Sequence, residues 1–358
     1  MIPYVCAFTG SCLSSLSYSF AKDISLRFIS WVCLFSFLFF PLAFRYKIGT
    51  DYANYTQILE TAFMFGYIPS FEIGWYPIIV FIKFFHLDLQ FFFIIPAFFS
   101  VLIFLYVVPP KKILFCLPVF FCFSWINSFN IVRQAFASMI FLLSLNCYQK
   151  NHFIRALFWG IIAFCFHKSA FLLCFLLIAA HFIRTVKNTY FNVSVFIIII
   201  LVFVVGKIGF RLFNAFAGYT PYAVYLNSEF SKQANLGSGL GVLLKEFILL
   251  LFLLSTQDGN DENFNKENNI VRIFVFMMGM AIALSAQIRI LGRMANLFDA
   301  IYVYLIVHMT FASLRLRKIY LIFIFLIASL LFFKTVVGSP SSARSGLGVF
   351  PYQSIFSR

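Results

Sequence analysis

The sequence contains little charge, and acidic residues are the scarcest charged type. Only 12 of its 358 residues are Asp or Glu, and charged residues amount to 11% of the chain. Hydrophobic residues make up 62%, and phenylalanine alone occurs 54 times. A water-soluble domain of this length could not cover such a composition with polar surface. The composition therefore excludes a soluble fold and predicts a polytopic membrane protein.

The sequence also lacks the common signatures of metal and nucleophile chemistry. It has no HExxH, GxSxG or Asp-x-Asp motif, and its eight cysteines form no C-x-x-C pair. The glycine-rich stretch 237–241 has no P-loop lysine, which favours a helix start or a close-packing site. The sequence therefore gives no support for a cofactor or for a metal-dependent mechanism.

Long apolar runs fill most of the chain. Runs this long and unalternating exclude a β-barrel, and the remaining way to satisfy the backbone in lipid is the helix. Because a spanning helix needs roughly 17–25 residues, we expect about 12 or 13 segments in a single all-α helical bundle without a soluble domain. Strong runs occupy residues 28–44, 89–108, 113–125, 191–205, 240–255, 270–285 and 319–336, and weaker or broken ones occupy 4–20, 76–85, 135–148, 154–166, 169–183 and 295–310.

Basic residues indicate the orientation of this bundle. They gather in four short turns, which the positive-inside rule places in the cytoplasm. The loop 206–238 then faces outward, whereas the acidic loop 257–269 stays cytoplasmic. Segment 76–85 is only about 15 Å long as a helix, too short to span, so the loop 45–75 is also expected outside. The basic turns contain Lys111 and Lys112, Lys150 and Arg155, Arg184 and Lys187, and Arg315, Arg317 and Lys318.

Charges and aromatic hydroxyls cluster in the loop 45–75. A carboxylate beside a guanidinium stays ionised and can orient a hydroxyl, and Tyr or Trp rings can stack on a sugar. Arg45 lies six residues before Asp51, so we expect an ion pair that suits Asp51 to position an acceptor. The alternative is an aromatic belt with a local ion pair. The candidates are Arg45, Gly49, Asp51, Tyr52, Tyr55 and Glu72.

Two further polar sites interrupt the apolar runs. Arg133 and Gln134 open a helix, where the arginine either meets an anion such as a pyrophosphate or snorkels to the surface. His167 and Lys168 form a break between two short apolar stretches, and irregular backbone at membrane depth is tolerated where it lines a cavity. His167 is either a general base or a structural hydrogen-bonding group.

Arg289 and Arg293 are spaced four residues apart, so on a helix both project from one face. Like charges at this spacing repel each other, and a polyanionic headgroup between them would relieve the repulsion. The nearest acidic residue, Asp299, lies further along the next apolar run. Asp299 and Glu246 are themselves acids within apolar runs, which fits either a proton-coupling carboxylate or a buried polar contact.

Several of these motifs, taken together and in order, resemble the EpsG-type branch of the Wzy-like polysaccharide polymerases. The resemblance covers roughly the first half of the chain and returns at residues 289–296. The rest is matched only by hydrophobicity. The motifs that carry the resemblance are Met1-Ile-Pro-Tyr4, Phe44-Arg45-Tyr46-x-Ile48-Gly49-Thr50-Asp51-Tyr52-x-Asn54-Tyr55, Glu72-Ile-Gly74, Val132-Arg133-Gln134-x-Phe136-Ala137 and Phe166-His167-Lys168-Ser169-Ala170.

The resemblance implies a metal-independent glycosyltransferase of GT-C-like type in the bacterial inner membrane. Such an enzyme polymerises O-antigen, capsule or exopolysaccharide repeat units on the outer face, from an undecaprenyl-pyrophosphate-linked oligosaccharide. A polysaccharide chain-length regulator is an expected partner. The resemblance reaches the site candidates Arg45, Gly49, Asp51, Tyr52, Glu72, Arg133, Gln134 and His167, and also Arg289 and Arg293.

Glycosyl transfer from such a carrier needs fixed positive charge at the leaving group and a group that takes a proton from the attacking hydroxyl. We expect Arg133, Arg289 and Arg293 to supply the charge and Glu72 or His167 to take the proton. Two other functions stay open. A flippase or transporter of lipid-linked sugars would be expected to show repeat symmetry between its halves, and a membrane acyltransferase would need a central catalytic histidine.

Overall fold

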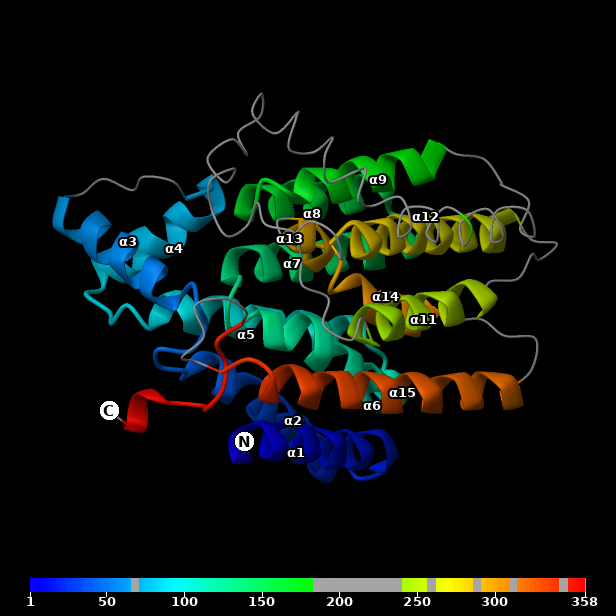
Figure 1. Cartoon of the computed structure of the whole chain (residues 1–358), viewed down its shortest axis with the longest axis horizontal. Coiled ribbons are helices and arrows are strands. Elements are labelled where there is room, and N and C mark those ends of the chain that lie inside the picture. Colours follow the sequence, from blue (N-terminus) through cyan, green and yellow to red (C-terminus); the bar gives the residue numbers. More distant parts are fainter. Residues whose placement is uncertain are drawn as a thin grey trace. The chain divides into compact units, whose positions relative to one another are not determined.

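The computed structural model describes residues 1–65, 71–182, 197, 240–255, 262–285, 291–308, 314–340 and 347–357. Within them the regular structure is helical apart from two isolated β-bridges, which confirms the all-α class. The longer helices are α1 (Ile2–Phe20), α2 (Ile24–Ala43), α3 (Tyr52–Phe65), α4 (Tyr76–Phe84), α5 (Phe91–Val107), α6 (Pro110–Val119), α7 (Val132–Gln149), α8 (Phe153–Phe166), α9 (Ala170–Phe182), α11 (Leu240–Ser255), α12 (Glu262–Ser285), α13 (Leu291–Asn296), α14 (Ile301–His308) and α15 (Leu314–Val337) (Figure 1).

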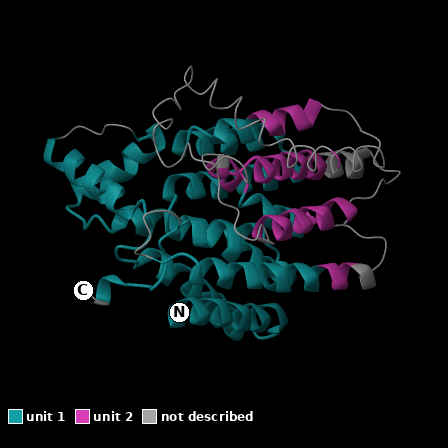
Figure 2. Ribbon diagram, viewed as in Figure 1, with its two compact units in different colours: residues 1–174, 299–307, 321–358 teal, residues 175–298, 308–320 magenta. Residues whose placement is uncertain are grey.

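The chain forms two compact units (Figure 2). The first contains Met1–Cys174, Asp299–Val307 and Leu321–Arg358, and the second contains Phe175–Phe298 and His308–Tyr320. In the second unit, α12 packs against both α11 and α13. The candidate residues from Arg45 to Lys168 all belong to the first unit.

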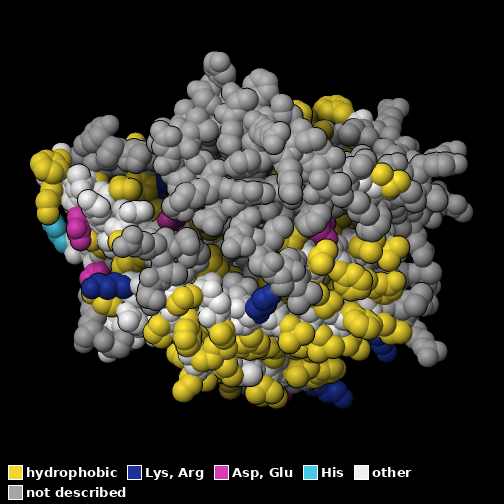
Figure 3. Space-filling view, viewed as in Figure 1, with side chains coloured by type: hydrophobic (Ala, Val, Ile, Leu, Met, Phe, Trp, Pro, Cys, Tyr) yellow, Lys and Arg dark blue, Asp and Glu magenta, His cyan; other side chains and the backbone are white. Residues whose placement is uncertain are grey.

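Two described helices are long and apolar enough to cross a membrane, Ile24–Ala43 and Arg317–Val337. Only 28% of the first apolar window and 33% of the second are buried, so most of these side chains face outward, where lipid suits them better than water. Figure 3 shows hydrophobic side chains gathered over the area that α1, α2 and α15 occupy in this view. Apolar helices of this kind indicate an integral membrane protein.

Two segments that were predicted to be loops contain helical residues in the structure. Loop 45–75 contains α3, whose buried Tyr52, Tyr55, Leu59 and Ala62 recur at helical spacing. The acidic loop 257–269 overlaps α12, which begins at Glu262. Helix α4 has nine residues, about 13.5 Å, and is therefore too short to cross a bilayer, as expected for segment 76–85.

Two predicted runs change conformation part-way. Run 113–125 begins in α6 and continues as a π-helix at Phe120–Trp125, just after Pro118. Run 295–310, expected to be weak or broken, is interrupted by a turn between α13 and α14. Buried Asp299 lies in that turn and accepts a hydrogen bond of 2.7 Å from Asn127 Nδ2. This side-chain bond fastens the turn to the segment after the π-helix.

Aromatic side chains fill the core of the first unit. Trp125 is fully buried, donates from Nε1 to Leu38 O at 2.8 Å, and meets the ring of Tyr4 edge-on at 6.1 Å between centroids. Phe121 and Phe332 pack 5.2 Å apart and join the π-helix to α15. The π-helix is thereby held between α1, α2 and α15, and its last residues lead directly into the segment that carries the candidate site.

Candidate functional site

The turn Asn127–Asn130, here called the platform of the site, accepts hydrogen bonds from the residues of the motif loop. It links the π-helix to α7 and is closed by its own backbone, since the amides of Asn130 and Ile131 both donate to Asn127 O at 3.0 Å. Asn127 and Asn130 are buried. Buried amide side chains need partners, and these two find them in distant segments, Asn127 at Asp299 and Asn130 at the loop 45–51.

The motif loop docks directly on this turn. Asn130 Oδ1 accepts hydrogen bonds of 2.9 Å from Thr50 Oγ1 and from the amide of Asp51. Gly49 has φ +95°, and a Cβ at this position would lie 2.1 Å from Phe129 O. Only glycine fits both constraints. In this structure Gly49 therefore allows a close backbone contact.

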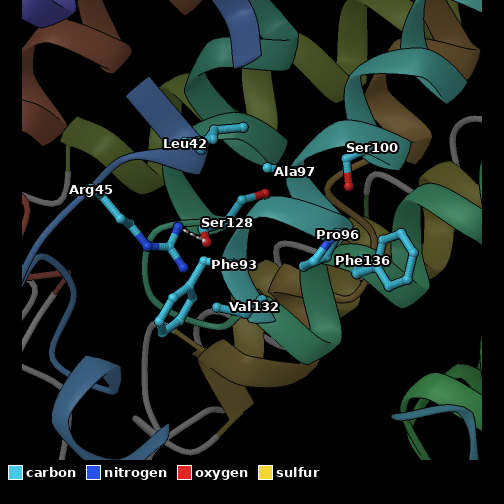
Figure 4. A pocket seen from close by; sticks show the side chains of 9 residues that line it. All are labelled: Leu42, Arg45, Phe93, Pro96, Ala97, Ser100, Ser128, Val132 and Phe136. Atoms are coloured by element: carbon cyan, nitrogen blue, oxygen red, sulfur yellow. Dashed lines mark hydrogen bonds between the residues drawn. The ribbon is translucent and has the colours of Figure 1, made fainter. Parts of the chain in front are cut away.

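Arg45 is buried beneath the same turn. Its Nη1 donates to Ser128 O at 2.7 Å, and its guanidinium lies over the rings of Phe93, at 4.6 Å, and Phe129, at 5.4 Å. Figure 4 shows Arg45 with Ser128 and Phe93, which line a cavity of about 10 Å³ with room for about one water molecule. Burial lowers the pKa of Arg45 to about 10, opposed by neighbouring tyrosines, so the side chain stays charged at neutral pH.

The expectation that Arg45 pairs with Asp51 is wrong. Arg45 donates to a main-chain carbonyl, and the ion pair of this site joins Arg133 to Glu72 instead. The pairing of Arg45 with Asp51 was expected because the two residues are close in sequence, whereas the fold brings together Arg133 and Glu72, which are 61 positions apart. Asp51 is held through its backbone amide, and its side chain is half-buried.

Three other predicted binding residues lie in the core. Tyr52 stacks on Phe93 with 4.9 Å between centroids, and Tyr55 and Gln134 are also buried. Such positions do not offer a face to a sugar in this structure. They fix α3 and the start of α7 against α5.

A second cluster forms where residues 72–75 meet the end of α8. Trp75 begins the turn into α4, is fully buried, and donates from Nε1 to Phe166 O at 2.8 Å. Its ring packs against Phe92 at 4.8 Å and Phe166 at 5.4 Å. A Cβ on Gly74 would lie 2.8 Å from Cys165 O. These contacts bring Glu72 close to the break after α8.

Glu72 and Arg133 form a salt bridge of 2.8 Å, with side-chain exposures of 9% and 26%. The guanidinium also lies over the ring of Phe71 at 5.1 Å and that of Tyr55 at 5.8 Å. An ion pair that is largely removed from water interacts more strongly than a surface pair. Arg133 therefore gives the carboxylate of Glu72 a cationic partner and ties the loop to the first turn of α7.

A cavity of about 600 Å³ opens beside this ion pair. Its size lies within the range of roughly 300–1,000 Å³ typical of small-molecule sites. Aromatic rings with a carboxylate and an ammonium group suit a sugar ring, which offers both apolar faces and hydroxyls. We call it the Glu72 cavity; it is lined by Phe71, Glu72, Ile73, Tyr76, Phe164, Cys165 and Lys168.

His167 lies in the break next to Lys168. Its Nδ1 accepts the amide hydrogen of Ser169 at 3.2 Å and lies 2.7 Å from Ser169 Oγ. A neutral ring in this arrangement carries its proton on Nε2. His167 thus organises the start of α9 through its Nδ1.

The predicted arginine cluster is only partly described. Arg289 lies outside the described residues, and Arg293 is half-buried in α13 of the second unit. Convergence of Arg133, Arg289 and Arg293 on one pyrophosphate therefore stays a prediction. Within the described ranges, no group of three His, Cys, Asp or Glu side chains could hold a metal ion.

Sequence reasoning missed several residues that complete the site. Asn130 and Ser128 are the partners of the motif loop, and Tyr76 and Phe164 line the Glu72 cavity. Asn130 lies two residues before the motif that begins at Val132, so its amide side chain could have been noticed. Nothing local distinguishes Phe164 from the many other phenylalanines of the chain.

Comparison with protein-family models identifies the family of the chain. A model of the EpsG family matches residues 28–354, which confirms the resemblance carried by the motifs. No curated protein and no solved structure matches the chain. The match spans both units and indicates a polysaccharide polymerase-like role for an integral membrane protein.

We expect Gly49→Ala to lower the free energy of unfolding by about 2 kcal/mol or more, because the substitution adds strain at positive φ and forces Phe129 O away. Thermal unfolding in detergent measures the change. Gly241→Ala is the matched control, since a Cβ there meets no atom within 4 Å. Equal midpoints for the two variants would contradict the close docking of the loop.

The ion pair predicts a coupling energy between its two members. Glu72→Gln and Arg133→Gln should each destabilise the protein, and the double variant should lose less than their sum by about 1–2 kcal/mol. Thermal unfolding of the four proteins gives this double-mutant cycle. Strictly additive effects would show that the two side chains do not stabilise each other.

Proposed function

The chain belongs to the EpsG family, and we propose that it polymerises lipid-linked oligosaccharide repeat units by glycosyl transfer in the membrane. The observation that carries this proposal is the Glu72 cavity, which combines aromatic walls, the carboxylate of the Glu72–Arg133 salt bridge and a lysine in a space suited to a sugar. The donor is a polyprenyl-pyrophosphate-linked glycan, and the acceptor is another repeat unit. The GT-C-like type and the outward-facing site are parts of the same proposal.

Glu72 is the residue that meets the acceptor in this proposal. Its salt bridge to Arg133 holds the carboxylate in place at the cavity, where it can orient a hydroxyl. The carboxylate accepts the hydrogen bond of the attacking hydroxyl and takes its proton as the bond to the anomeric carbon forms. Asp51, held at its amide by Asn130, is proposed to position the acceptor.

In this proposal, cationic groups and hydrogen-bond donors bind the leaving pyrophosphate. Lys168 is exposed at the cavity, and Nε2–H of His167 can donate to a phosphate oxygen. Negative charge that develops on the leaving group is stabilised by such preorganised groups. Arg289 and Arg293 are proposed to act on the same pyrophosphate. The buried residues Arg45, Tyr52, Tyr55 and Gln134 act by positioning.

A deletion strain provides the test of the overall function. Loss of long surface polysaccharide with single repeat units retained at the surface is the expected result. Loss of both would identify a flippase instead, and unchanged length of the polysaccharide with altered acylation would identify an acyltransferase. Mass spectrometry of the extracted glycans separates these outcomes. A chain-length regulator is the proposed partner and would change the length distribution without being needed for linkage formation.

We expect Glu72→Gln to reduce turnover about 10² to 10⁴-fold, because the amide keeps the shape but cannot take a proton. Turnover is measured on purified protein with lipid-linked repeat units extracted from the deletion strain. Glu60→Gln, on α3, is the matched control. Turnover within a few-fold of the wild type, with substrate still bound, would remove Glu72 from the proton-transfer step.

Lys168→Ala should lower kcat/KM for the lipid-linked donor about tenfold, because it removes a charge-assisted contact to the pyrophosphate as negative charge develops there. Lys22→Ala, at an exposed lysine between α1 and α2, serves as the control. Initial rates at several donor concentrations give both constants. An unchanged kcat/KM would place the pyrophosphate away from the Glu72 cavity.

A further inference from the structure

A segment distant in sequence completes the motif loop. Residues 347–355, here called the strap, run beside residues 44–50 in the first unit (Figure 1). At one end the amides of Gly49 and Thr50 donate to Gly348 O, at 3.0 Å, and Leu347 O, at 3.3 Å. At the other end, the amide of Tyr46 donates to Gln353 O at 3.0 Å. The strap therefore accepts hydrogen bonds from backbone amides at two places within the motif, at Tyr46 and at Gly49 and Thr50.

The pairing is antiparallel around Arg45. The amide of Ile355 donates to Phe44 O at 3.0 Å, which places Ser354 opposite Arg45 in an isolated β-bridge. Opposed residues in such a bridge have close backbones. The strap thus covers the backbone of the very residue whose side chain reaches the turn Asn127–Asn130.

Side chains anchor the strap to the helices below. Tyr4 donates its hydroxyl hydrogen to Val349 O, and Tyr352 donates to Pro41 O at 3.1 Å. The rings of these two tyrosines meet edge-on at 5.7 Å. Val349 is fully buried, and its amide donates to Ser339 O at 2.9 Å. The strap is therefore fixed to α1, α2 and the end of α15, and it can transmit that fixed position to the motif loop.

Gly348 is the residue on which this contact depends. It has φ +62°, where a side chain is strained, and a Cβ would lie 3.1 Å from Thr50 Cγ2 and 3.3 Å from the amide nitrogen of Thr50. Any larger residue must push the strap away from Thr50. Thr50 in turn bonds Asn130, so the displacement would reach the platform of the site.

We infer that the strap is a positioning element of the candidate site. The strap holds residues 46–50 by main-chain hydrogen bonds, and Thr50 of this loop donates to Asn130. Arg133, which binds Glu72, lies three residues after Asn130 in the chain. Without the strap, the amides of Tyr46, Gly49 and Thr50 would lose the partners that the strap provides, and a backbone amide that is left unpaired away from water is costly. Its effect on turnover rests on the proposed function, whereas its effect on the loop backbone does not.

Hydrogen–deuterium exchange tests the structural half of this inference. In Gly348→Ala, amides in peptides covering residues 44–51 should exchange about tenfold faster, equivalent to about 1.4 kcal/mol less protection. Ile355→Pro removes a single donor at the other end of the strap and keeps the test available if the first variant is not folded. Gln353→Ala is the control, because only the main-chain carbonyl of this exposed residue is used.

The same variants are assayed for polymer formation from extracted lipid-linked repeat units. Gly348→Ala should lower turnover about tenfold at an unchanged amount of folded protein. Adding Thr50→Ser should restore part of it, because serine keeps the hydroxyl that bonds Asn130 but lacks the Cγ2 that the new methyl group meets. Because the second substitution would also relieve a loss of stability caused by the same clash, turnover is compared at equal amounts of folded protein.

Each result decides the inference. Faster exchange together with lower turnover and rescue supports it. Unchanged exchange in both strap variants overturns it, as does faster exchange with wild-type turnover. Wild-type protein that makes no polymer, while the strap variants still exchange faster, would refute the proposed function and leave the strap as a structural holder of the loop.

Discussion

The burial of Arg45 is the constraint on which the rest of the site depends. A guanidinium withdrawn from water is costly unless its hydrogens meet acceptors. Arg45 donates from Nη1 to Ser128 O and lies over the ring of Phe93, whereas its buried Nε has no hydrogen-bond partner among the described residues. The bond to Ser128 O is therefore one that this site cannot lose without cost. The turn Asn127–Asn130 must therefore stay in place, with α2 on one side and α5 on the other. Gly49 then has to follow the carbonyl of Phe129 closely.

The position of the turn decides where the ion pair lies. Asn130 receives the motif loop, and Arg133 follows within one turn of helix, so the two contacts cannot move independently. Trp75 fixes the other member of the pair, because its indole donates to Phe166 O while Glu72 lies three residues earlier. The carboxylate of Glu72 therefore lies between the start of α7, where Arg133 is, and the break after α8.

The sequence predicted features that depend on residues close to each other in the chain, and it did not predict contacts between residues far apart in the chain. Apolar runs predicted the helices, and helical spacing of Tyr52, Tyr55 and Leu59 could have predicted α3 as well. The pairing of charges could not be read, because neighbourhood in sequence favoured Arg45 with Asp51 while the fold joined Glu72 to Arg133. The strap contributes main-chain bonds, which leave no pattern of side chains to recognise.

The charge balance of the Glu72 cavity narrows what it can hold. Arg133 compensates the charge of Glu72, so the lysine at the wall leaves this lining with a net positive charge. Phe71, Tyr76 and Phe164 add apolar faces without further charge. A neutral sugar alone would use the rings and leave the lysine facing water. A glycan that carries a phosphate near its reactive carbon would use both, which fits the proposal that the donor end of a lipid-linked repeat unit meets the acceptor hydroxyl at this cavity.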